Sequence, residues 1–183
     1  MKMLWLLSLL FVGVSAQAAQ PAARQPGLDC PANRLSAEES RALAGAAMEQ
    51  APREDPRALP LFRAVETCGR ELSWSPAKQR WAGMFTLATI GAAGTRELLG
   101  RRGVSVGELD QAILSDRELM AAAEAGGLGD NRVGEAFATR HLALLERIAA
   151  GQELTGEVGR RLGHYIAFRA PIEATARQFG RSP

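Results

Sequence analysis

The sequence predicts an all-α protein, and three features of the chain support this class. Hydroxyl residues followed three positions later by glutamate recur along the chain, which is a pattern of helix N-termini. Apolar residues then return at intervals of three and four positions, as they do on one face of a helix. No alternation of apolar and polar residues is long enough to predict a strand. We therefore expect six or seven short helices packed as an irregular orthogonal bundle.

Residues 1–18 have the composition of a cleavable secretory signal peptide. Lys2 precedes the apolar run Leu4–Val14, and the small-x-small sequence Ala16–Ala18 follows it. The run is about half of the ~20 residues that cross a bilayer, and no later segment approaches that length. Neither a twin arginine nor a cysteine that could carry a lipid flanks the run. The sequence therefore predicts export to the periplasm or the extracellular space, as a soluble protein with no transmembrane span.

Residues 19–34 are predicted to form a disordered or loosely attached lead-in, because they are rich in Pro, Ala and Gln and offer little to bury. Residues 35–183 have an ordinary size for a single helical domain. The 183-residue chain carries a net charge of +2, which falls to +1 once Lys2 leaves with the signal peptide. So balanced a charge gives no reason to expect a nucleic-acid partner.

Cys30 and Cys68 are the only cysteines, and we expect them to form a disulfide that ties the lead-in to the domain. An even number of cysteines in an exported chain favours a disulfide over free thiols. A metal site or a redox pair is the alternative, but the C-x-x-C spacing is missing and no histidine lies near either cysteine. We expect neither a metal nor a cofactor.

The first helix is predicted to start at Ser36, which forms a capping box with Glu39, and to end near Ala51. Pro60 opens a second helix, whose apolar spacing places Cys68 on the buried face.

Ser75 and Pro76 are predicted to begin a third helix, since proline at the first helical position has no amide to leave unpaired. This helix should end near Gly91, and a short turn should follow it.

Ser105 lies in the sequence Gly-Val-Ser-Val-Gly, which matches the G-x-S-x-G pattern of a hydrolase nucleophile elbow. The same serine precedes Glu108 by three residues, and Val104 and Leu109 occupy the positions of a hydrophobic staple. A nucleophile elbow needs a buried strand before the serine, which the charged segment 96–102 cannot form. We therefore interpret Ser105 as a helix N-cap.

Three further helices are expected toward the C-terminus. Ser115 with Glu118 repeats the capping signature, so the segment 106–125 is predicted to be two short helices with a kink between them. Thr155 is a candidate cap of the last helix, and Pro171 is expected to kink that helix or to start another one. Two apolar stripes should face the core: Val133, Phe137, Leu144 and Ile148, then Val158, Leu162, Tyr165 and Ile166.

Few residues are candidates for chemistry, because H-E-x-x-H, C-x-x-C-H, P-loop and EF-hand patterns are all missing from the sequence. His141 lies within an apolar stripe, where a histidine is more often a hydrogen-bonded core residue than a ligand. Arg169 falls at the centre of the last stripe, and a buried guanidinium needs a partner. Three explanations are open: Pro171 rotates the stripe, an acid from another helix pairs with Arg169, or the site binds an anion.

The segment from Thr155 onward carries five arginines against two glutamates, so positive charge is concentrated at the C-terminal end. The candidate partner- or anion-facing residues are Arg160, Arg161, Arg169 and His141. A solvated helix face is the alternative interpretation of this charge, and His164 is expected on that polar side.

The sequence contains no convergent set of acid, base, nucleophile and metal ligands, which argues against an enzyme. We predict a non-catalytic exported helical protein that contacts a protein partner or an envelope component. One alternative is a small hydrolase that uses a histidine and a carboxylate from different helices. Another is a carrier of an apolar small molecule, with a cavity lined by Trp74, Trp81, Phe85 and Phe137.

Overall fold

The computed structural model describes residues 25–52, 54–126, 131–149, 151–152, 154 and 156–183. The predicted signal peptide, residues 19–24 of the lead-in and the candidate cap Thr155 lie outside these residues. All regular structure within the described ranges is helical, which confirms the all-α prediction. The helices are α1 (Cys30–Asn33), α2 (Ala37–Met48), the 3₁₀ helix η1 (Pro56–Ala58), α3 (Leu59–Glu71), α4 (Pro76–Gly100), α5 (Gly107–Ser115), α6 (Arg117–Gly126), α7 (Asn131–Arg140), α8 (Leu142–Ile148) and α9 (Gly156–Arg181).

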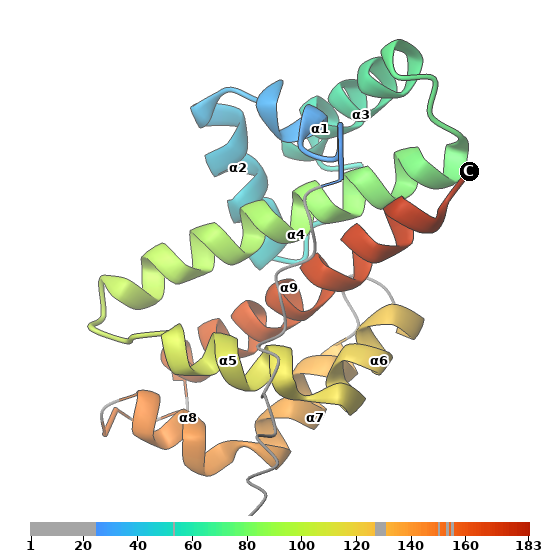
Figure 1. The fold of residues 1–183 in the computed structure, drawn as a ribbon. Coiled ribbons are helices and arrows are strands. Elements are labelled where there is room, and N and C mark those ends of the chain that lie inside the picture. Colours follow the sequence, from blue (N-terminus) through green and yellow to red (C-terminus); the bar gives the residue numbers. More distant parts are fainter. Residues whose placement is uncertain (1–24, 53, 127–130, 150, 153, 155) are drawn as a thin grey trace, which may run out of the picture.

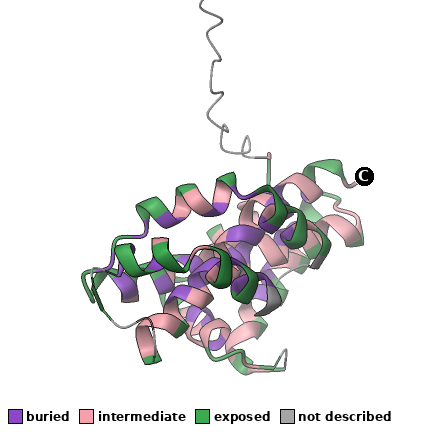
Figure 2. Cartoon of the chain, turned by 90° about the horizontal axis from the view of Figure 1, so that it is seen from below, coloured by how far each residue is buried: buried purple, intermediate pink, exposed green. Residues whose placement is uncertain are grey.

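The two longest helices, α4 and α9, pack against each other along the centre of the molecule (Figure 1). Helices α1, α2 and α3 pack against α4 on one side of this pair, and α5 to α8 lie on the other side, where α5, α6 and α7 contact α9. Buried residues follow the inner faces of the helices (Figure 2). Among the described helices, none combines the length and the hydrophobicity that a membrane span requires.

Two apolar clusters make up much of the core. The larger one lies where the C-terminal half of α4 meets α5 to α9, and it includes Leu99, Ile113 and Phe137. The smaller one joins Leu28, before α1, to Ala82 of α4 and to Phe179 at the end of α9. Residues 25–34 of the predicted lead-in therefore pack against the helices.

The predicted disulfide is present between Cys30 and Cys68, with an S–S distance of 2.03 Å and a Cα–Cα distance of 6.1 Å. It joins α1 to α3, and the Cys68 side chain is fully buried. The bond and the burial of Leu28 together explain why this part of the lead-in is ordered.

The two caps nearest the N-terminus form as predicted. The Glu39 amide donates to Ser36 Oγ at 3.1 Å, and the Ser36 amide donates to Glu39 Oε2 at 2.8 Å, which completes the capping box. Ser75 Oγ accepts from the Lys78 amide at 3.3 Å, and Pro76 is the first residue of α4. Both contacts join residues three positions apart, so they leave a signature in the local sequence.

Helix α4 does not end near Gly91 but continues to Gly100. Gly91 is buried against α9, where an added Cβ would lie 2.8 Å from the Phe168 ring. The glycine therefore permits the close approach of α4 and α9, and the prediction of a helix end at this position is wrong.

Ser105 is not the N-cap of α5. The helix begins two residues later, with Val106 at the N-cap position, and the Ser105 side chain is exposed. Val104 and Val106 are both buried, so apolar contacts fix the start of the helix. Ser105 follows the C-terminal turn of α4 rather than a strand, so the geometry of a nucleophile elbow is missing as well.

The helix boundary within 106–125 exists as predicted, but Asp116 and not Ser115 caps α6, through a 3.0 Å bond from the Leu119 amide to Asp116 Oδ1. A further boundary at His141 separates α7 from α8. As a result, Leu145 is the buried leucine of α8, whereas the predicted apolar stripe contained Leu144. These short helices explain why the described ranges hold more than the six or seven helices expected.

Helix α9 runs without interruption through Pro171, so this residue does not start a new helix. Proline removes the amide that would bond to the carbonyl of Ala167. Pro171 is itself buried, and the Thr175 hydroxyl donates to its carbonyl at 2.7 Å. Packing on both sides of α9 thus maintains a helix that the proline would weaken in isolation.

Candidate functional site

An apolar groove of about 440 Å³ lies between α2, α3 and α4, on the opposite side of the central helix pair from α5 to α8. Its volume is within the usual range for small-molecule sites. The large apolar side chain of Phe62 lines it while remaining 48% exposed. The lining residues are Leu43, Ala46, Ala47, Ala51, Pro52, Ala58, Leu61, Phe62, Val65, Gln79, Arg80, Gly83, Met84 and Leu87.

Small residues account for the hollow shape of this groove. Ala46 and Ala47 of α2 present only methyl groups to it. Gly83 of α4 presents none, and an added Cβ there would lie 3.3 Å from Val65 of α3. Larger side chains at these positions would fill the space between the three helices.

Polar side chains are sparse in the groove. Of the described lining residues, only Gln79 and Arg80 carry polar groups on their side chains. Gln79 Nε2 donates to the Trp74 carbonyl at 3.2 Å, whereas Arg80 is exposed and lies over the Trp81 ring, 5.2 Å from its centroid. Arg80 forms no ion pair with any residue in the described ranges. Within its described lining, the groove is therefore apolar, and the cation at its margin, Arg80, has no ion-pair partner.

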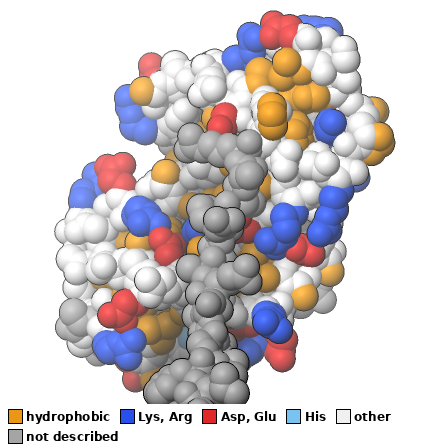
Figure 3. Space-filling view, viewed as in Figure 1, with side chains coloured by type: hydrophobic (Ala, Val, Ile, Leu, Met, Phe, Trp, Pro, Cys, Tyr) orange, Lys and Arg blue, Asp and Glu red, His pale blue; other side chains and the backbone are white. Residues whose placement is uncertain are grey.

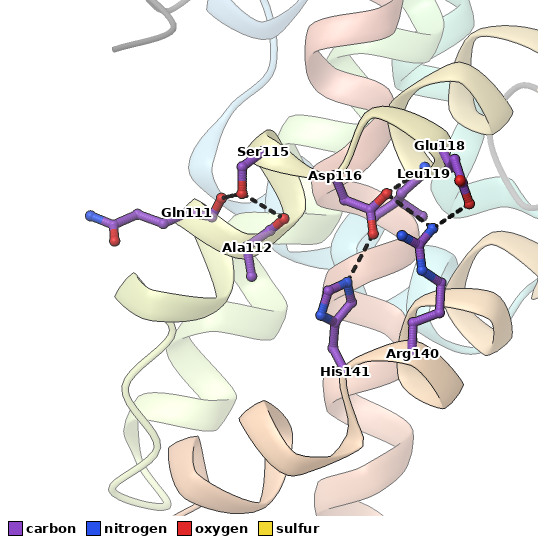
Figure 4. A network of polar contacts seen from close by, with 8 residues as sticks. All are labelled: Gln111, Ala112, Ser115, Asp116, Glu118, Leu119, Arg140 and His141. Carbon is purple, nitrogen blue, oxygen red and sulfur yellow. Dashed lines mark hydrogen bonds and ion pairs between the residues drawn. The ribbon is translucent and has the colours of Figure 1, made fainter. Parts of the chain in front are cut away.

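A second cluster, made of the polar side chains Asp116, Glu118, Arg140 and His141, lies on the other side of the molecule. It is located where the α5–α6 boundary meets the α7–α8 boundary (Figure 4). His141 Nε2 lies 2.8 Å from Asp116 Oδ2, and Arg140 Nη1 lies 3.2 Å from Asp116 Oδ1 and 2.7 Å from Glu118 Oε2. The Asp116 side chain is only 3% exposed, against 28% for His141. The His141 ring also packs on Phe137, with 4.4 Å between the ring centroids.

The pKa of Asp116 reflects opposing effects. Burial raises it, but the hydrogen bond with His141, the Leu119 amide and the charge of Arg140 outweigh burial, so the pKa lies below its ordinary value. Asp116 is therefore an ionised, hydrogen-bonded anchor at neutral pH.

A pocket of about 330 Å³ adjoins this cluster, with an apolar floor that includes Leu119, Val133 and Phe137. The serine nearest in sequence, Ser115, donates its hydroxyl to the carbonyls of Gln111 and Ala112 instead of to His141 (Figure 4). Within the described part of the chain, no group of three His, Cys, Asp or Glu residues could hold a metal ion.

Arg169 is paired with acids, which supports the second of its three explanations. Its side chain is 16% exposed, and Nε lies 3.2 Å from Asp110 Oδ1 on α5. Tyr165 also donates to Asp110 Oδ1, at 2.5 Å, and Arg96 of α4 pairs with the same carboxylate. Burial and the Asp110 carboxylate raise the pKa of Tyr165, so its hydroxyl stays protonated. Asp110 was not a candidate from the sequence, because its partners are distant along the chain.

The remaining candidates lie on α9. Arg161 pairs with Glu157, while Arg160 is exposed. His164 is half-buried, and its pKa is lowered by burial and then by the charges of Arg160 and Arg161. The four residues singled out for partner or anion contact thus do not form one site: His141 is bound to Asp116, Arg169 to Asp110, and Arg161 to Glu157.

The aromatic residues that the carrier alternative would place around one cavity lie in two separate parts of the core. Trp74, Trp81 and Phe85 pack against the smaller core cluster, where the Trp74 ring meets Phe179 edge-on with 5.2 Å between centroids. Phe137 belongs to the larger cluster. The apolar groove is lined instead mainly by aliphatic residues of α2 to α4, together with Phe62.

Charges over the face seen in Figure 1 are mostly interspersed, with acidic and basic side chains next to each other (Figure 3). Apolar side chains gather in the upper part of this face, where α1 and α3 lie (Figures 1 and 3). A broad cationic surface that would attract nucleic acid is not visible on this face.

No known family model, curated protein or solved structure matches this chain. The assignment of a site therefore rests on the contacts and the chemistry of its own residues.

Proposed function

We propose that this chain is a non-catalytic helical protein that binds an apolar part of a partner or an envelope component in the groove between α2, α3 and α4. The apolar groove is the observation that carries the proposal. Hollowed apolar surface of this kind on a helical protein is typical of binding sites. The described lining contains no acid, base or nucleophile that could perform a reaction on the ligand.

Export is part of this proposal. The N-terminal sequence has the order of a signal peptide, and the disulfide between Cys30 and Cys68 is typical of proteins that fold in an oxidising compartment. The groove would then face the periplasm or the extracellular space, where apolar envelope components are available.

The test uses a neutral apolar dye, Nile red, whose fluorescence rises in an apolar environment. Ala47→Phe places a large side chain in the groove, whereas Ala93→Phe places the same side chain on an exposed position of α4 outside it. We expect the wild-type protein and the Ala93→Phe variant to bind the dye equally. The Ala47→Phe variant should bind about tenfold more weakly, or not at all.

Equal dye binding by all three proteins would place the apolar surface elsewhere and overturn the proposal. Failure of the wild-type protein to bind the dye would do the same. Circular dichroism spectra of the variants serve as the control for folding.

Acid–base catalysis is a second candidate function, favoured by the 2.8 Å contact between His141 and Asp116, a residue that lines the 330 Å³ pocket. In this case the carboxylate would orient the imidazole, and the imidazole would activate water for a hydrolysis. A panel of p-nitrophenyl esters tests it, with His141→Gln compared against His164→Gln. Turnover that only His141→Gln abolishes would support this candidate, and the absence of turnover by the wild-type protein would remove it.

A further inference from the structure

We propose that the occupant of the α2–α3–α4 groove is a single-chain amphiphile with a carboxylate head, of the fatty-acid class, whose head group pairs with Arg80. This inference rests on the proposed function, because it names the ligand of the same groove. The chain would lie among the aliphatic lining residues, and the carboxylate would lie at the margin.

The charge distribution around the groove supports an anionic head group. Two of the described arginines differ in their partners: Arg80 lines the groove, and Arg57 directly precedes the lining residue Ala58. Arg57 Nη2 is 2.8 Å from Glu49 and 2.8 Å from Asp55, so its charge is compensated by the protein. Arg80 has no acidic partner among the described residues, and its guanidinium lies over the Trp81 ring. A ligand carboxylate would therefore complete the pairing of Arg80 without displacing an existing ion pair.

The size of the groove favours a ligand with one alkyl chain over a peptide helix. An α-helix with its side chains is about 10–12 Å across, so a groove that accepts a helix is long and wide. A volume of about 440 Å³ is instead in the range of small-molecule sites. Val65, Met84 and Leu87 are partly exposed and offer aliphatic surface beside Phe62, which favours an apolar chain over a polar ligand.

Arg80 also provides a readout that is independent of affinity. Its guanidinium lies over the Trp81 ring at 5.2 Å, so a carboxylate that binds Arg80 changes the surroundings of this indole. We expect tryptophan emission to change when the anionic ligand binds.

The experiment compares three ligands with the same alkyl chain, each below the concentration at which it forms micelles: dodecanoate, 1-dodecanol and dodecyltrimethylammonium. Binding is measured by displacement of Nile red and by tryptophan emission at low salt. The wild-type protein should prefer dodecanoate over 1-dodecanol by about two- to fivefold, which is the size of one exposed ion pair, and bind the ammonium most weakly. Arg80→Gln should abolish the preference for dodecanoate, and Arg80→Glu should reverse it toward the ammonium.

Arg117→Gln is the matched control, since Arg117 is an exposed arginine at the start of α6 and lies outside the groove. It should leave the order of affinities unchanged. Equal binding of dodecanoate and 1-dodecanol by the wild-type protein, or a preference that Arg80→Glu does not alter, would overturn the inference and leave the apolar groove intact as a binding site. Binding of none of the three ligands, with no displacement of the dye, would overturn the inference and the proposed function together.

Discussion

In the polar cluster around His141, the Asp116 carboxylate contacts three partners, whereas Glu118 contacts Arg140. One oxygen accepts from the Leu119 amide at the start of α6 and from Arg140 at the end of α7. The other oxygen contacts His141, at the boundary with α8. A buried carboxylate with several donors stabilises the folded state only while it is ionised.

Replacing Asp116 with asparagine should destabilise the protein by about 1–3 kcal/mol at pH 7, because the charge-assisted bonds with His141 and Arg140 are lost. Folding lowers the pKa of Asp116, so its stabilisation is fully present above the ordinary pKa near 4 and is lost as the pH falls through the folded value. The difference between wild type and Asp116→Asn should therefore shrink toward pH 3. Urea unfolding of both proteins at pH 7 and pH 3 measures it.

Glu118→Gln is the matched control, since Glu118 pairs with the same arginine but its side chain is 84% exposed. Its effect should stay below about 1 kcal/mol at either pH. A destabilisation by Asp116→Asn that is equally large at pH 7 and pH 3 would show that the charge of Asp116 is not what stabilises the cluster.

Single residues were predictable from the sequence only where their partners are close along the chain. Ser36 and Ser75 bond to amides three positions away, and both caps are correct. Asp110 meets Tyr165 and Arg169 over more than fifty positions, and nothing in the local pattern around it indicates those contacts. That Arg80 has no ion pair with a described acid also depends on which residues the fold brings near it.

Helix ends, too, are predictable from the sequence only where local contacts determine them. Gly91 and Pro171 are residues that often end a helix, yet both lie inside the two central helices. The close packing of α4 on α9 decides these positions, and packing between helices distant in sequence is not visible in a local pattern. Conversely, Val104 and Leu109 are buried as the staple pattern requires, although Ser105 does not cap the helix.

The crossing of α4 and α9 gives a prediction at this scale. Alanine at position 91 gains about 1 kcal/mol in helix propensity, but its methyl group would lie within 2.8 Å of the Phe168 ring. Overpacking typically costs about 1–3 kcal/mol, so Gly91→Ala should be neutral or destabilising. Gly163→Ala on α9 is the matched control, because its methyl group meets no atom within 4 Å. That variant should be stabilised by about 1 kcal/mol.

Thermal unfolding of the two glycine variants measures the difference. Gly91→Ala should unfold at a lower temperature than Gly163→Ala, by an amount that corresponds to about 1–3 kcal/mol. Equal stabilisation by both substitutions would mean that α4 and α9 have room to accept a side chain at position 91.

The molecule as a whole has two sides, separated by the central pair of helices. The groove and the disulfide belong to the side formed by α1, α2 and α3, whereas the larger apolar cluster belongs to the side formed by α5 to α8. The sequence indicated the disulfide and the all-helical class. It did not indicate this two-sided arrangement, because the arrangement depends on which faces of α4 and α9 meet each neighbour.

Reduction of the disulfide should affect these two sides differently. The bond closes a loop over a sequence separation of 38 residues, which corresponds to about 4 kcal/mol of stabilisation through the unfolded chain. It also attaches α1 to α3, while the large cluster around Leu109 and Phe137 contains neither cysteine. Local opening is easiest where few apolar contacts hold an element, so the amides of α1 to α3 should exchange faster after reduction while those of α5 to α9 stay protected.

Hydrogen–deuterium exchange measured by mass spectrometry, with and without a phosphine reductant, tests this prediction. The Cys30→Ala/Cys68→Ala variant is the control, because the reductant should leave its exchange unchanged. An equal rise in exchange across all helices would contradict it and show that the two sides unfold as one cooperative unit.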